Sequence, residues 1–142
     1  MAKREVLPQK QIALVAHDNK KDSLIRWAAR HKESLQSHQL LGTGTTAEAI
    51  EEQTGLKLER LLSGPLGGDQ QLGAMIATGK IDLLVFFWDP MQSQPHDDDV
   101  KAVLRLATLW NVALASNETT ADFLLTSVLI SQSVTIHIPD AD

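Results

Sequence analysis

Two apolar runs constrain the fold of this chain more than any other feature. Ile12–Ala16 reads IALVA, and Ile81–Trp88 reads IDLLVFFW and contains the longest unbroken apolar run of the sequence. Strands without a polar face are covered on both sides, as in parallel sheets that pack between helices. Both runs are far too short to span a bilayer. We therefore expect two strands of a covered sheet, with Ile81–Trp88 at its centre.

Helical patterns alternate with these strands and with weaker ones. The alternation predicts an α/β fold: a single domain over residues 1–142, doubly wound and of the Rossmann or flavodoxin type. Its sheet is mostly parallel and five- to six-stranded, with helices on both faces. The further strands expected are Gln39–Thr43, Leu58–Leu62, Val112–Ala115 and, as a last edge strand, Val134–Ile138. The expected helices are Asp22–His31, Thr46–Gln53, Asp69–Thr78, Val100–Trp110 and Thr119–Leu125.

Composition and charge exclude several classes of function. The net charge of −5 argues against binding to nucleic acid or to an anionic membrane surface. Three phenylalanines, three tryptophans and no tyrosine leave few groups for base stacking. The absence of cysteine excludes disulfides and a thiolate zinc site. Residues 1–11 are polar and basic, without the apolar stretch of a secretory signal, so we expect a cytoplasmic protein.

Unusual polar residues follow most of the expected strands. In open α/β sheets, ligands bind beyond the carboxyl ends of the strands. Because those ends share one edge of a parallel sheet, we expect these residues to lie together. They are His17, Asp18 and Lys21 after the first strand, Thr43–Thr46 after the second, Ser63, Gly64 and Asp69 after the third, and Asp89, His96 and Asp99 after the fourth.

Asp69 stands behind four glycine or proline positions in Leu61–Gln71, LLSGPLGGDQQ. A carboxylate on a glycine-rich turn at the mouth of a sheet can act as a base on a small bound ligand, and the glycines leave room for that ligand to approach the backbone. A position at a helix start lowers the pKa of Asp69 and weakens it as a base. Exclusion of water and the charge of a bound phosphate act in the opposite direction.

Thr43–Thr46 has two interpretations. Glycine, hydroxyls and the free N–H groups of a helix start together form a phosphate cradle. Alternatively, Thr45 is a helix N-cap and Glu48 completes a capping box. Ser63-Gly64 is a weaker version of the same pattern. Lys21 either supplies positive charge to a bound phosphate or is a solvated lysine at a helix start.

The histidines and acids around this edge also leave alternatives. His17 directly follows a buried strand, so a free surface position is disfavoured. The acids before Val100 suit a helix N-terminus, which leaves His96 unexplained; a nearby carboxylate can orient its imidazole, and a His/Asp metal site is a further alternative. Asp89 is either a turn residue or faces the site. Arg105 is either exposed or serves a subunit contact or a phosphate.

Taken together, these motifs resemble the methylglyoxal synthase family, and with their spacing they cover nearly the whole chain. They are Ala13–Asp18 (ALVAHD), Thr43–Thr46 (TGTT), Leu62–Gln71 (LSGPLGGDQQ), Phe86–Pro90 (FFWDP), Pro95–Asp97 (PHD) and Ala121–Phe123 (ADF). The resemblance implies conversion of dihydroxyacetone phosphate to methylglyoxal and inorganic phosphate. It also implies no cofactor and no metal, a homohexamer, and inhibition by phosphate.

The resemblance also assigns roles to residues of this sequence. Asp69 matches the catalytic acid. A neutral His96, held by Asp99, is implied to donate to the enediolate oxygens, as a neutral histidine does in triosephosphate isomerase. Asp18, Asp89 and Asp99 match acids placed around the site, while the role of Arg105 stays open. The positions that match substrate contacts are His17, Lys21, Thr43, Gly44, Thr45, Thr46, Ser63, Gly64 and His96.

Two points qualify the resemblance. The sequence ends at Pro139–Asp142, whereas longer family members continue with a basic helical tail. We expect any phosphate-contacting arginine of that tail to be missing here. This leaves the expected activity intact, but it leaves phosphate regulation and part of the subunit packing open. The alternative function is a non-catalytic domain that senses a small molecule or phosphate, as in the regulatory domains of carbamoyl phosphate synthetase. The presence of Asp69, His96 and His17 favours the enzyme.

Overall fold

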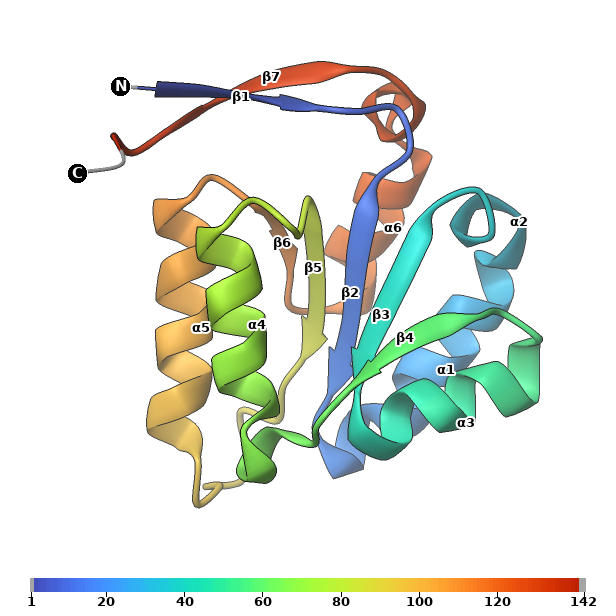
Figure 1. The fold of residues 1–142 in the computed structure, drawn as a ribbon. Helices are drawn as coiled ribbons and strands as arrows, with labels where there is room; N and C mark the ends of the chain where they lie inside the picture. The colour runs from blue at the N-terminus through green and yellow to red at the C-terminus, as the bar shows by residue number, and fades with distance from the viewer. Residues whose placement is uncertain (1, 141–142) are drawn as a thin grey trace.

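A five-stranded parallel sheet forms the centre of the computed structural model, which describes residues 2–140 (Figure 1). Its order is β4-β3-β2-β5-β6, and all four neighbouring pairs are parallel. The middle strand is thus β2 and not, as expected, the Ile81–Trp88 segment, which lies beside it. Both segments are interior strands, and that explains why neither has a polar face. The strands are β2 (Gln11–Ala16), β3 (Gln39–Thr43), β4 (Leu58–Leu61), β5 (Leu83–Phe87) and β6 (Ala113–Ala115).

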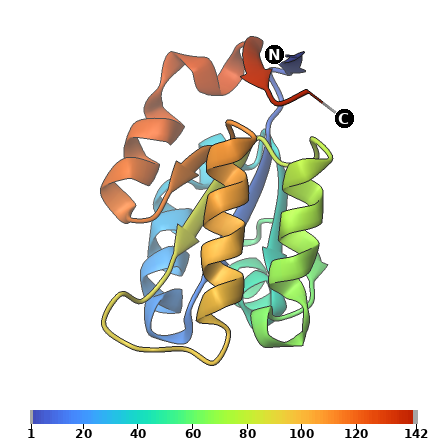
Figure 2. The ribbon, with the colours of Figure 1, turned by 90° about the vertical axis from the view of Figure 1, so that its left-hand side faces the viewer.

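Helices cover both faces of this sheet, as the doubly wound prediction requires. The helices are α1 (Lys21–Arg30), α2 (Lys32–Leu35), α3 (Gly44–Thr54), α4 (Gly68–Ala77), α5 (Asp97–Leu109) and α6 (Glu118–Thr126), with short 3₁₀ turns η1 (Asp18–Lys20), η2 (Gly64–Leu66) and η3 (Val128–Ser131). Figure 2 shows α4 and α5 side by side on one face. The other face carries α1, α3 and α6.

Strand β2 shows how the sequence builds two cores. Ile12 and Leu14 point to the α1/α3/α6 side, whereas Ala13 and Val15 point to the α4/α5 side. This is the two-residue period of a strand with apolar groups on both faces. Each fully buried Leu or Ile contributes about 1.5–3 kcal/mol. The sheet is therefore held firmly, and its carboxyl ends form a rigid base for a site.

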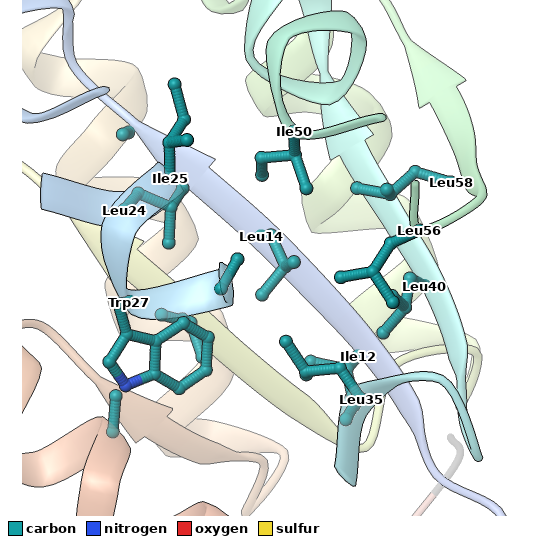
Figure 3. Packing of buried hydrophobic residues seen from close by; sticks show 14 of the residues in the cluster. Ile12, Leu14, Leu24, Ile25, Trp27, Leu35, Leu40, Ile50, Leu56 and Leu58 are labelled. Atoms are coloured by element: carbon teal, nitrogen blue, oxygen red, sulfur yellow. The ribbon is translucent and has the colours of Figure 1, made fainter. Parts of the chain in front are cut away.

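Trp27 on α1 is the largest fully buried side chain of the first core (Figure 3). Its Nε1–H donates to Asp122 Oδ1 on α6 at 3.0 Å. The same oxygen lies 2.6 Å from His31 Nε2. Asp122 thus joins α1 to α6 and satisfies a buried donor.

The chain ends form a second, separate sheet. Ala2–Val6 (β1) pairs antiparallel with Val134–Ile138 (β7), so the expectation that Val134–Ile138 is the last edge strand of the main sheet is wrong. We call this pair the terminal ribbon; it lies at the amino ends of the sheet strands (Figure 1). Arg4 of the ribbon bonds Asp82 at 2.8 Å, and Lys10 Nζ donates to the carbonyls of Leu7 and Gln132. Ala141 and Asp142, part of the expectation about the sequence end, lie outside the described residues.

No helix within residues 2–140 is long and apolar enough to cross a membrane.

Candidate active site

A cavity of about 120 Å³ opens at the carboxyl ends of the central strands. Its volume is well below the roughly 300–1,000 Å³ of sites for drug-sized ligands, so it suits a small metabolite. The position, beside the middle strand where the chain reverses its direction across the sheet, is the usual ligand site of this architecture. The lining residues are Val15, Ala16, His17, Asp18, Lys21, Thr43, Gly44, Thr45, Thr46, Ser63, Gly64, Pro65, Asp69, Phe86, Gln94 and His96.

Asp69 lies in the first turn of α4 and is only 2% exposed. Its Oδ2 is buried without a hydrogen-bond partner and lies 3.8 Å from His96 Nε2. Burial raises the pKa of this carboxyl, His96 opposes the rise, and the negative charge of Asp99 adds to it. The net effect is a raised pKa, so Asp69 is a stronger base than an ordinary aspartate.

His17 follows β2, and its imidazole has a defined protonation state. The Asp89 backbone N–H donates to Nδ1 at 3.0 Å, and a backbone N–H can only donate. The ring is therefore neutral and carries its proton on Nε2, which is buried without a partner. Burial, followed by the neighbouring His96, lowers the pKa of His17, against the acids Asp97, Asp89 and Asp18. His17 thus presents a free N–H donor in the cavity wall.

His96 occupies the N-cap position of α5, and its ring stands 5.5 Å from that of His17. Its Nδ1 is buried without a partner. The expectation that the Asp99 carboxylate holds this ring is wrong: Asp99 bonds His96 only through its backbone, N–H to carbonyl at 3.0 Å. The Asp99 side chain instead lines a groove between α4 and α5, behind Asp69. The Asp99 carboxylate therefore acts on Asp69 through its negative charge and makes no hydrogen bond to the imidazole of His96.

The Thr43–Thr46 segment has the features of an anion cradle. Thr43, not Thr45, is the N-cap of α3, and its side chain makes no capping bond, so the capping-box interpretation is wrong. The first N–H groups of α3 therefore remain without a side-chain acceptor at the cavity wall. Lys21 Nζ lies 2.7 Å from Thr45 Oγ1 and 2.9 Å from Asp18 Oδ1. Lys21 is the only cationic side chain that lines this cavity within the described part of the chain.

Gly64 and Gly68 serve the site by allowing close approach. A Cβ on Gly64 would stand 3.1 Å from His96 Nε2 and 3.3 Å from each carboxylate oxygen of Asp69. A Cβ on Gly68 would collide with the Leu62 carbonyl oxygen. Gly64 thus lets Asp69 and His96 meet. Gly68 packs the turn against its own chain, and this differs from the expected role of making room for a ligand.

The three supporting residues are placed differently. Asp18 lines the cavity and is paired with Lys21. Asp89 is buried behind His17, where its Oδ1 accepts from the Met91 N–H and its Oδ2 from Asn19 Nδ2; these bonds lower the pKa of Asp89. Arg105 is exposed on α5 and does not line the cavity.

Sequence reasoning missed several residues of this site. Pro65, Phe86 and Gln94 line the cavity, and Asn19 supports Asp89. Phe86 belongs to the apolar core pattern, and Asn19 has the composition of an ordinary turn, so neither carries a distinctive signal. Gln94 lies in the segment between Asp89 and His96, where its position next to Pro95-His96 is the one usable hint. Within residues 2–140, no three His, Cys, Asp or Glu side chains lie close enough together to hold a metal ion.

The fold and site define a class: an α/β domain whose parallel sheet presents an anion cradle beside a buried acid and two histidines. Residues 23–116 match the family described as MGS-like domain. The methylglyoxal synthase of Erwinia tasmaniensis is 58% identical over 96% of this chain and 90% of its own length. That of Saccharophagus degradans is 57% identical over 93% of this chain and 86% of its own length. A crystal structure of methylglyoxal synthase from Elizabethkingia anophelis has a TM-score of 0.94 and 51% identity, covering 100% of this chain and 93% of that one.

The chain belongs to the methylglyoxal synthase family, and its relatives are enzymes.

Proposed function

We propose that this protein is a carbon–oxygen lyase that converts dihydroxyacetone phosphate to methylglyoxal and inorganic phosphate. One observation carries the proposal. Among the described residues, four buried side-chain atoms lack a hydrogen-bond partner, and three of them belong to this cavity: Asp69 Oδ2, His17 Nε2 and His96 Nδ1. Buried polar groups without partners are rare, so a base and two imidazoles left free beside an anion cradle point to a polar phosphorylated ligand.

In the first step, Asp69 Oδ2 takes a proton from the carbon that bears the hydroxyl group. The electron pair moves to the carbonyl oxygen and gives an enediolate. His17 Nε2–H donates to the developing oxyanion, which lowers the barrier most where water is excluded. His96 lies beside both Asp69 and His17, and it moves the proton between the two oxygens.

In the second step, the π electrons of the enediolate expel phosphate. The C–O bond to phosphate breaks with its electron pair on the leaving oxygen. The resulting enol takes up a proton at its terminal carbon and gives up its hydroxyl proton, and so becomes methylglyoxal. Expulsion requires that bond to stand perpendicular to the enediolate plane. The Thr43–Thr46 cradle, Ser63-Gly64 and Lys21 set this angle and stabilise the departing dianion. A substrate analogue bound with its phosphate oxygen in the enediolate plane would contradict this step.

The proposal extends to regulation and assembly. Inorganic phosphate fits the same cradle, so we expect it to inhibit as a product. We also propose that residues 1–142 act as a single domain without a cofactor or metal, in the cytoplasm and as a homohexamer. The resemblance to the family supports these points.

The test is incubation of the purified protein with dihydroxyacetone phosphate. We expect methylglyoxal and inorganic phosphate to appear in equal amounts. A protein that binds phosphate tightly but releases no methylglyoxal would instead be a sensor of the carbamoyl phosphate synthetase type.

A further inference from the structure

The state of His17 depends on one backbone group of the loop between β5 and α5. Protonation of His17 would place a second donor at Nδ1, facing the Asp89 N–H that now donates to it at 3.0 Å. The two donors cannot coexist, so the loop must withdraw before His17 can gain a charge. Whatever fixes Asp89 therefore also fixes the neutral form of His17 and the proton on Nε2.

A single side chain clamps this loop. Asn19 Nδ2 donates to Asp89 Oδ2 at 2.9 Å and to Gln92 Oε1 at 2.7 Å. A carboxylate accepts and never donates, so only one orientation of the Asn19 amide satisfies both bonds. The loop carries both acceptors, and Asn19 lies two residues after His17. Figure 2 shows the loop as the yellow segment that leads from β5 to α5.

The clamp is separate from the core. Asn19 is exposed in η1, whereas Asp89 is only 6% exposed. Truncation of Asn19 therefore removes two hydrogen bonds without opening a cavity among apolar side chains. It also leaves the Met91 N–H on Asp89 Oδ1, so the local turn persists.

We propose that Asn19 is a positioning residue, which holds the Asp89 N–H on His17 Nδ1 and thereby keeps His17 as a neutral Nε2–H donor. The role in turnover rests on the proposed function; the effect on His17 does not. Asn19 does not line the cavity.

The charges around His17 give the direction of the effect. Asp18, Asp89 and Asp97 favour the charged imidazole, while burial and His96 disfavour it. The edge of Phe86 also packs against the ring. Asp89 moves with the loop, but Asp18 lies outside it and Asp97 at the start of α5. Once the loop is free to withdraw, the fixed N–H no longer opposes these two acids, so protonation of His17 becomes easier.

The experiment follows His17 directly in protein labelled with ¹⁵N-histidine and without substrate. The wild type should show a single tautomer with its proton on Nε2; His17→Gln identifies the signal among the five histidines. In Asn19→Ala we expect a mixture of tautomers and a rise in the pKa of His17 by up to about one pH unit, the size of one hydrogen bond to the neutral form. Gln92→Ala removes one of the two bonds, so its His17 pKa should lie between those of the wild type and Asn19→Ala.

The matched control is Met91→Ala, which shortens an exposed side chain of the same loop and keeps both bonds of the clamp. Its His17 should show the same tautomer and the same pKa as in the wild type. In turnover, Asn19→Ala should move the acid limb of the kcat/KM profile, which reports the free enzyme, to higher pH by the same amount. At neutral pH the KM should stay nearly unchanged, because the cradle is intact.

An Asn19→Ala protein whose His17 keeps one tautomer and the wild-type pKa overturns the proposal, whatever happens to its activity. A shifted His17 signal in a protein that makes no methylglyoxal supports the clamp and contradicts the proposed function instead.

Discussion

Gly64 is the glycine that stands directly against both Asp69 and His96. Any Cβ there stands 3.1 Å from His96 Nε2 and 3.3 Å from the Asp69 oxygens. We expect Gly64→Ala to lower kcat by about 100-fold, since displacement of reacting groups by a fraction of an ångström to 1 Å has effects of this order. The fold should persist, and steady-state kinetics with circular dichroism will separate the two effects.

Gly73→Ala is the matched control for that change. Its new Cβ would meet only the flexible end of Leu106, at 3.1 Å, and alanine favours a helix interior. We expect unchanged activity. A comparable loss of kcat in both variants would show that Gly64 has no special place beside Asp69 and His96.

The buried carboxylate of Asp69 is expected to favour activity at a cost in the stability of the fold. Burial raises its pKa in the folded state, so the carboxylate costs stability above the folded pKa, and the cost disappears as the pH falls below the ordinary value. We expect Asp69→Asn to raise the free energy of unfolding at pH 7 by about 1 kcal/mol. Urea unfolding should show this gain shrinking toward pH 4. A variant less stable than the wild type at pH 7 would contradict the burial argument.

At the scale of elements, the carboxylate of Asp122 connects α6 to α1 through hydrogen bonds. Its removal leaves the Nε1–H of the fully buried Trp27 without an acceptor. We expect Asp122→Ala to lower the free energy of unfolding by about 1–3 kcal/mol, the cost of an unsatisfied buried donor, and to leave kcat nearly unchanged. Chemical unfolding at pH 7 with parallel kinetics will measure both.

The stability that Asp122 contributes also has a defined pH dependence. The hydrogen bond from His31 holds the pKa of Asp122 below its ordinary value. The contribution of Asp122 to the free energy of unfolding is therefore complete above the ordinary aspartate pKa of about 3.9. It is lost as the pH falls through the lower pKa of the folded state. Asp122→Asn keeps an acceptor for Trp27 and should lose less than Asp122→Ala. Equal losses would mean that the bond to Trp27 contributes little.

The main sheet and its helices could be predicted because each has a local signal. Apolar runs mark β2 and β5, and the polar residues at strand ends mark the cavity. The terminal ribbon could not be predicted, since Ala2–Val6 is largely polar and its pairing with Val134–Ile138 joins opposite ends of the sequence. Side-chain direction was also beyond the sequence: Asp99 is close to His96 along the chain yet faces a different groove.

At the scale of the whole molecule, the terminal ribbon and the cavity lie at opposite ends of the sheet. Asp82 connects the ribbon to the sheet: Oδ1 accepts from Arg4 and Oδ2 from the Gln11 N–H, both at 2.8 Å. We expect Asp82→Ala to lower the free energy of unfolding by about 1–3 kcal/mol and to speed amide exchange in β1 and β7. Exchange in β2 and β5 should change far less.

The distance between ribbon and cavity makes this prediction specific. Asp82→Ala should leave the KM for dihydroxyacetone phosphate and kcat close to those of the wild type. Loss of activity at preserved stability would show that the ribbon acts on the site, although the ribbon lies at the amino ends of the strands (Figure 1) and the cavity at their carboxyl ends.

We propose Asp69 as the base of a phosphate-eliminating lyase, and a comparison of the wild type with Asp69→Asn on dihydroxyacetone phosphate tests this role. Asparagine keeps the size of the side chain but cannot take the proton. We expect the wild type to release methylglyoxal and phosphate in equal amounts. In Asp69→Asn we expect kcat to fall by orders of magnitude, while the protein still binds inorganic phosphate. An Asp69→Asn protein that forms methylglyoxal at the wild-type rate would contradict this role.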